Sequence, residues 1–187
     1  MVRILWFVPL LLLAILTAGC SNDPGTGPAE VKWDRVACER CRMVLSDRHY
    51  SAEVRVHPEG KRSKVYFFDD IGCAVLWLEG DGKAWADDPK TEIWVKDHRN
   101  GEWIDARTAT YVEGKVTPME YGLGAQSDPA PGGMDFAAAK RRIHQVEERF
   151  NAHGVQLLDR LREQQRRREE QRKQAAGTAS PSSGQPR

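Results

Sequence analysis

Apolar and polar residues alternate along two short stretches, residues 51–57 and 63–68. Side chains that alternate with a period of two are typical of strands with one buried face. Pro58, Glu59 and Gly60 lie between the stretches and have the chemistry of a tight turn. The pattern therefore predicts an antiparallel hairpin.

A short apolar segment follows, from Ile71 to Glu79. Asp69 and Asp70 precede it and can cap the first turn of a helix, and the Gly-Asp-Gly sequence at 80–82 can end one. We expect a helix over 71–79. Cys73 lies within that helix, and because free cysteine often packs as a small buried apolar residue, we assign it that role by default.

Three further stretches rich in β-branched and aromatic residues predict strands at 91–97, 102–105 and 109–113. Asn100-Gly101 between the first two is a strong hairpin signal. Residues 117–122 and 127–133 contain proline and glycine and are expected to be loops. The order strand-strand-helix-strand-strand-strand predicts an α+β fold of small antiparallel β-β-α-β units, which a C-terminal amphipathic helix follows.

The helical period begins near Asp135. Apolar residues recur every seven positions at Phe136, Ile143, Phe150 and Leu157. This stripe predicts an amphipathic helical segment over 126–162, which Gly154 could divide in two. Apolar positions then vanish, so residues 163–187 are expected to be a charged tail, either a solvated helix extension or disordered.

The N-terminus has the anatomy of an export signal. An apolar run at 4–16 is followed by small residues and then Cys20, which resembles a bacterial lipobox. We expect a signal peptide over 1–19, a lipidated Cys20 and a flexible tether over 20–32. Ser21 resembles the outer-membrane sorting pattern, so the protein would face the periplasm from a lipid anchor. The alternative is an ordinary cleaved signal with an incidental cysteine.

Charge and motifs exclude several classes of function. The formal net charge is +1, and residues 160–173 hold seven Arg or Lys against three Glu. The domain has no basic patch interleaved with aromatics, so nucleic acid is not an expected partner. The sequence has no nucleophile elbow, phosphate loop or dinucleotide motif. We therefore expect a binding protein and not an enzyme.

Candidate chemistry centres on Cys38-Glu39-Arg40-Cys41-Arg42-Met43. Thiolates and thioethers are soft ligands that select soft metals, Cu(I) in particular. If the segment is extended, Cys41 and Met43 point to one face. Arg40 and Arg42 would favour the Cys41 thiolate.

Cys38 has two interpretations. It could be a further sulfur ligand, or it could form a disulfide with Cys41 in an oxidising compartment. With Cys20 set aside for lipid, three cysteines remain, and an odd number leaves at least one free or bound to metal. A zinc ribbon would need a second cysteine pair, which this sequence lacks. A thioredoxin-like dithiol would need its motif at the start of a helix, whereas the residues after Cys41 have an extended pattern. The sequence therefore favours neither chemistry.

Other potential ligands lie far from this motif. Met119 follows a proline in a loop and is a candidate distal ligand, although a packing role is the alternative. His49 could ligate, but a surface residue is the simpler interpretation. We interpret Met134 as packing.

Five segments, in this order, resemble the NosL family of lipoproteins. They are Cys41-x-Met43, Phe67–Cys73, Trp94–Asp97, Trp103–Ala106 and Thr117–Gly122. The family's members are copper-binding accessory proteins of nitrous oxide reductase, thought to deliver Cu(I). The resemblance maps Cys41 and Met43 onto the family's copper motif and Met119 onto its later methionine. It also implies two β-β-α-β units, but no closing strand follows the helix near Asp135.

The sequence thus favours a lipid-anchored Cu(I) metallochaperone that delivers copper to a client protein such as nitrous oxide reductase. Cys38, Cys41, Met43 and Met119 are its candidate ligands. The first alternative is a dithiol–disulfide reductant acting through Cys38 and Cys41. The second is a structural lipoprotein whose helical tail binds a partner or an anionic surface.

Overall fold

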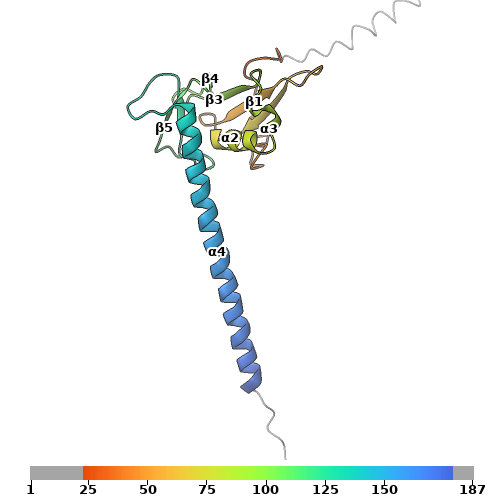
Figure 1. The fold of residues 1–187 in the computed structure, drawn as a ribbon, viewed down its shortest axis with the longest axis vertical. Helices are drawn as coiled ribbons and strands as arrows, with labels where there is room; N and C mark the ends of the chain where they lie inside the picture. The colour runs from red at the N-terminus through yellow and green to blue at the C-terminus, as the bar shows by residue number, and fades with distance from the viewer. Residues whose placement is uncertain (1–22, 179–187) are drawn as a thin grey trace, which may run out of the picture.

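A four-stranded antiparallel sheet in the order β2-β1-β3-β4 lies in the globular part of the protein, toward one end of the elongated molecule (Figure 1). The structure is a computed structural model, and it describes residues 23–178. The strands are β1 (Ala52–Val56), β2 (Lys64–Phe68), β3 (Glu92–Lys96) and β4 (Trp103–Asp105). The predicted hairpin is confirmed, since β1 pairs with β2 from Ala52 opposite Phe68 to Val56 opposite Lys64.

Helix α2 (Ile71–Glu79) lies against one face of this sheet. Its predicted cap is confirmed: the Asp70 carboxylate accepts a hydrogen bond from the Gly72 amide at 2.9 Å, and Gly80 follows the last turn. One short helix, α3 (Lys83–Ala86), was not predicted. It has only four residues and no side-chain cap, so the sequence carries little signal for it.

The opposite face of the sheet carries Glu53 and Arg55, which are both fully buried. Buried charged groups need polar partners, and the N-terminal segment supplies them. The Ala29 amide donates to Glu53 at 2.8 Å, and the Arg55 guanidinium donates to the Gly27 carbonyl at 2.8 Å and to Asp23 at 2.9 Å.

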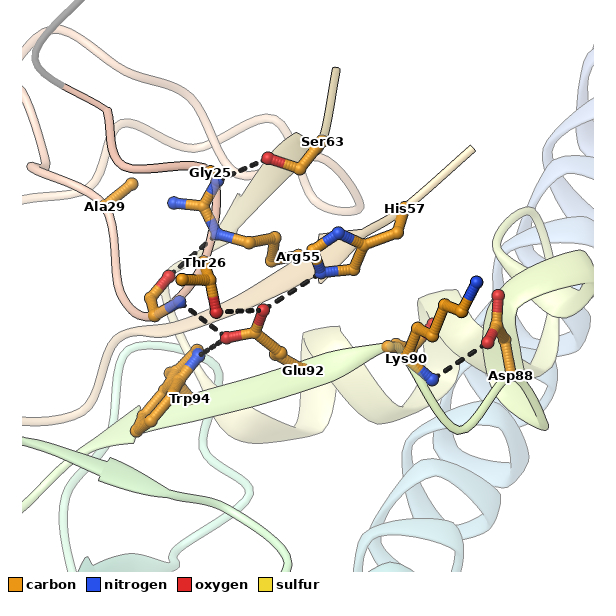
Figure 2. A network of polar contacts seen from close by, with 12 residues as sticks. Gly25, Thr26, Ala29, Arg55, His57, Ser63, Asp88, Lys90, Glu92 and Trp94 are labelled. Atoms are coloured by element: carbon orange, nitrogen blue, oxygen red, sulfur yellow. Dashed lines mark hydrogen bonds and ion pairs between the residues drawn. The ribbon is translucent and has the colours of Figure 1, made fainter. Parts of the chain in front are cut away.

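Glu92 completes this network (Figure 2). Its carboxylate accepts from the Gly27 amide at 2.7 Å, from the Thr26 hydroxyl and the Trp94 indole at 3.1 Å, and lies 2.9 Å from His57 Nε2. The expectation of a flexible tether over 20–32 is therefore wrong for the described part, which begins at Asp23. The predicted signal peptide and Cys20 lie outside the described residues.

A second, two-stranded sheet pairs β5 (Thr110–Val112) with β6 (Gly124–Gln126). The sequence predicted β5 but not β6, because Gly-Ala-Gln has no β-branched or aromatic residue. The two sheets join where the His98 amide donates to the Ala125 carbonyl at 2.8 Å. The long loop between β5 and β6 carries Met119.

Helix α4 (Phe136–Thr178) begins after Asp135, whose carboxylate accepts from the Ala138 amide at 2.7 Å. Its first turns bury Ala139, Ile143 and Val146, and the remainder projects away from the domain (Figure 1). The break expected at Gly154 is absent from the helix as described.

Of the two alternatives for residues 163–187, the solvated helix extension is found over 163–178, because α4 continues to Thr178. Strong helix formers fill this part of the sequence, and Glu163 pairs with Arg166 and Arg167 one turn away. Within the described residues, no helix is long and apolar enough to cross a bilayer. The fold is α+β, as expected, with one β-β-α-β unit formed by β1, β2, α2 and β3.

The buried Glu53 predicts a pH dependence of stability. Burial raises the pKa of Glu53 from 4.5 to about 7. The carboxyl group ionises first in the unfolded chain, so its contribution to stability is present below pH 4.5 and is lost as the pH rises through about 7. The difference between these two pKa values corresponds to a free energy of about 3 kcal/mol. In Glu53→Gln, the free energy of unfolding relative to wild type should increase by up to about 3 kcal/mol between about pH 4.5 and pH 8.

Denaturant unfolding at several pH values measures this difference. The exposed Glu30→Gln is the matched control and should follow the wild type throughout. A Glu53→Gln curve parallel to wild type at every pH would contradict the assignment.

Candidate metal centre

Residues 38–43 form a tight turn, which we call the cysteine knuckle. The Cys38 amide donates to the Met43 carbonyl at 2.8 Å, and the Arg42 amide donates to the Cys38 carbonyl at 3.1 Å. Arg42 adopts a left-handed backbone with φ of 67°. An isolated antiparallel bridge between Ala37 and Val44 closes the base of the knuckle.

The knuckle is attached to the edge of the main sheet. The Glu39 amide donates to the Phe67 carbonyl on β2 at 2.9 Å. Because β2 runs directly into Asp69 and the cap of α2, this contact brings the knuckle to the first turn of the helix. Cys73 lies in that turn.

Three thiols and a carboxylate converge at this junction. The sulfur atoms of Cys38, Cys41 and Cys73 and one carboxylate oxygen of Asp69 all lie within 4.8 Å of one another. We call this group the thiol cluster. Cys38 and Cys73 are fully buried, Asp69 is 2% exposed and Cys41 is half-buried. All three cysteines are free, so the Cys38–Cys41 disulfide is not present.

The three thiols differ in their hydrogen bonds and in their pKa values. The Cys41 thiol donates to Asp69 Oδ2 at 3.2 Å, and the Cys41 amide donates to the Cys38 sulfur at 3.5 Å. A hydrogen bond with Cys73 holds the pKa of Cys38 below its usual value, at about 6. Burial raises the pKa of Cys41 to about 12. The hydrogen bond with Cys38 raises the pKa of Cys73.

The expectation that Arg40 and Arg42 favour the Cys41 thiolate is wrong. Arg40 is paired with Glu147 at 2.8 Å, and Arg42 lies 3.6 Å from Glu39. Burial dominates at Cys41 and favours its protonated form. Negative charge is instead favoured at Cys38, which accepts donors from both the turn and α2.

Asp69 carries a further indication of a ligand. Its Oδ1 atom is buried and has no hydrogen-bond partner among the described residues. A buried acceptor without a partner costs about 1–3 kcal/mol. A metal ion held by the three sulfurs would lie beside this carboxylate and could satisfy it. Three thiolates with one oxygen suit a soft or borderline ion such as Cu(I) or Zn²⁺.

Of the two candidate methionines, Met43 lies differently from the sequence expectation, whereas Met119 takes the packing position that the sequence offered as its alternative. Met43 is 46% exposed, and the turn at Arg42 removes the extended geometry from which we placed Cys41 and Met43 on one face. Met119 is partly buried and packs against the core.

The remaining sequence candidates lie apart from the thiol cluster. His49 is exposed, and its Nδ1 lies 3.1 Å from the His98 carbonyl oxygen. Met134 packs against the core, in agreement with the prediction. Cys73 is buried as expected, but it belongs to the cluster, which the default interpretation missed.

Asp69 was also missed as a member of the cluster. The sequence did offer a signal, because only one of two consecutive aspartates can cap a helix. Asp70 takes the cap and leaves Asp69 free to face the cysteines.

The site thus has the chemistry of a thiol-rich metal centre on an α+β fold. No family model matches the sequence, and no curated protein matches it. Among solved structures, the chain is similar to the crystal structure of the copper chaperone NosL from Shewanella denitrificans. The TM-score is 0.43 and the identity 18%, and the alignment covers 64% of this chain and 88% of that one. The thiol cluster and the sequence motifs are the observations that support a metal-binding function.

Burial predicts the order in which the thiols react. In the folded, reduced protein, an alkylating reagent should modify Cys41 well before Cys38 and Cys73, because only Cys41 has exposed surface. Peptide mass spectrometry of a time course measures the three rates separately. Modification of Cys38 or Cys73 as fast as Cys41 would contradict the described burial.

Proposed function

We propose that this protein is a Cu(I)-binding metallochaperone. The observation that carries the proposal is the convergence of three free thiols and a buried carboxylate oxygen within 4.8 Å. Soft thiolates bind Cu(I) strongly, and Asp69 Oδ1 has no other partner among the described residues. Copper is the cargo of such a protein, so no covalent bond of a substrate is made or broken.

Cys41 suits the role of the exchange ligand. It is the one member of the thiol cluster with substantial exposure, while Cys38 and Cys73 hold the cargo from beneath. A ligand from an incoming protein can then attack the metal on the Cys41 side. We propose two thioether ligands during entry or release: the exposed Met43, two residues after Cys41 in the chain, and Met119.

The proposed setting is the bacterial cell envelope, with a lipid on Cys20 and the domain facing the periplasm. The sequence supports it through the export signal and the lipobox. A client such as nitrous oxide reductase is proposed from the five motifs that resemble the NosL family.

The second candidate function is a dithiol–disulfide reductant. The lowered pKa of Cys38, about 6, favours it, because a Cys38 thiolate can resolve a mixed disulfide that the neighbouring Cys41 forms with a client. In this reaction Cys41, the accessible thiol, would attack a client disulfide. Cys38 would then displace the client thiol, leaving a Cys38–Cys41 disulfide and two reduced client thiols.

An anaerobic Cu(I) titration of the reduced full chain against a competing chelator tests the first proposal. We expect one Cu(I) per chain. Cys41→Ser should weaken binding by more than about 100-fold, which exceeds the usual cost of losing an outer-shell group. Met43→Leu and Met119→Leu should weaken it less, by about tenfold each. Met134→Leu, which also removes a thioether but lies outside the cluster, is the matched control and should bind as wild type.

Each alternative gives a different result. A wild-type protein that does not bind Cu(I), but reduces a model disulfide in a reaction that requires Cys38, would favour the reductant. Preference for Zn²⁺ over Cu(I) in the same competition would contradict the copper assignment. A protein that binds neither metal nor disulfide, but loses a partner when residues 160–187 are deleted, would be the structural lipoprotein.

A further inference from the structure

The long helix α4 reaches into the cysteine knuckle through one ion pair. Arg40 lies between the two cysteines of the knuckle, and its Nη2 donates to Glu147 Oε1 on α4 at 2.8 Å. Its Nη1 donates to the Tyr121 hydroxyl at 3.1 Å, and that hydroxyl donates to Glu147 Oε2 at 2.9 Å. We call these three residues the Arg40 clamp.

The three residues of the clamp hydrogen-bond to one another and are partly shielded from solvent. The side chains of Arg40 and Glu147 are 30% and 27% exposed, and Tyr121 is buried. Charge-assisted hydrogen bonds in such surroundings are about twice as strong as neutral ones. Burial also raises the pKa of Tyr121, so its hydroxyl remains a donor to Glu147.

The clamp also contacts α2, the helix that carries Cys73 of the thiol cluster. The Tyr121 ring packs on Gly72, where an added Cβ would lie only 2.2 Å from the ring. Gly72 directly precedes Cys73 in α2. One tyrosine therefore bridges α2, which carries Cys73, and the knuckle, which carries Cys38 and Cys41.

Beyond the clamp, α4 makes little use of its length for packing. Among the residues of α4 whose side chains the structure describes, the last buried one is Val146, directly before Glu147, while Phe150, Leu158 and Leu161 are exposed. Because α4 has 43 residues, it is about 65 Å long, and most of it projects as an arm (Figure 1). A protein bound to this arm could pull directly on the turn that carries Glu147.

We propose that Glu147 is a positioning residue, which keeps the cysteine knuckle closed over the thiol cluster, and that α4 thereby controls access to Cys41. This inference concerns the regulation of the proposed metal site and rests on that function. Release of Glu147 frees Arg40, lets the knuckle move away from α2 and exposes Cys41. Cargo exchange would then be coupled to contact with the projecting helix.

The test follows thiol access in the reduced full chain without metal, so it does not depend on copper binding. The rates of alkylation of Cys38, Cys41 and Cys73 are measured separately by peptide mass spectrometry. Glu147→Ala should raise the Cys41 rate about five- to tenfold, as expected when a charge-assisted contact that holds the closed state is lost. Glu148→Ala, at the exposed neighbouring position with no described side-chain partner, is the matched control and should leave the rate unchanged.

Exchanging the charges of Arg40 and Glu147 tests whether the slow alkylation of Cys41 can be restored. Arg40→Glu and Glu147→Arg should each raise the Cys41 rate, and the double variant should return it toward wild type, since the pair is restored with reversed charges. Tyr121→Phe keeps the ring on Gly72 and removes only the hydroxyl, so a moderate rise of about threefold is expected even if other variants fold poorly.

Two outcomes would overturn the inference. The first is a Cys41 rate that does not change in Glu147→Ala and Tyr121→Phe. The second is an equal rise at Cys73 with a matching fall in melting temperature, which would mean that the whole domain opens. Failure of the copper titration with a positive alkylation result would leave the clamp intact and refute only the metal function.

Discussion

The hydrogen bond from the Glu39 amide to the Phe67 carbonyl is the contact on which the rest of the site depends. Strand β2 is the outer strand of the sheet, so one of its edges has unpaired backbone groups. The cysteine knuckle occupies that edge at the point where β2 ends and Asp70 starts α2. This contact helps to set the position of Cys38 and Cys41 relative to Asp69 and Cys73, and the hydrogen bond of Arg40 to Glu147 attaches the knuckle to α4 as well.

Two different coverings keep the sheet and the site rigid. Helix α2 packs apolar residues on one face, while the N-terminal segment meets the buried charges of Glu53 and Arg55 on the other. Because the second covering is polar, its stability changes with pH, as the raised pKa of Glu53 indicates. The thiol cluster lies at the end of the sheet, where both the helix cap and the knuckle can reach it.

Local signals were sufficient for much of the fold. The period-two pattern located β1 and β2, and the aspartates located the start of α2. The sequence also placed Cys38 and Cys41 at the site. For Asp69 it offered only the spare aspartate beside the helix cap, and for Cys73 no signal, because their proximity to the knuckle depends on an edge-strand contact between distant segments. For the same reason the sequence predicts a tether at the Gly- and Pro-rich N-terminus, since the partners of this segment, Arg55 and Glu92, lie on strands far along the chain.

The central claim is that sulfur atoms from the knuckle and from α2 hold one Cu(I) together. X-ray absorption at the copper edge of the loaded full chain, compared with a Cys73→Ser variant, tests it most directly. The account predicts a first shell dominated by sulfur that loses one sulfur neighbour in the variant, since Cys73 converges with Cys38 and Cys41. A shell of nitrogen and oxygen, or a sulfur shell identical in both proteins, would contradict it.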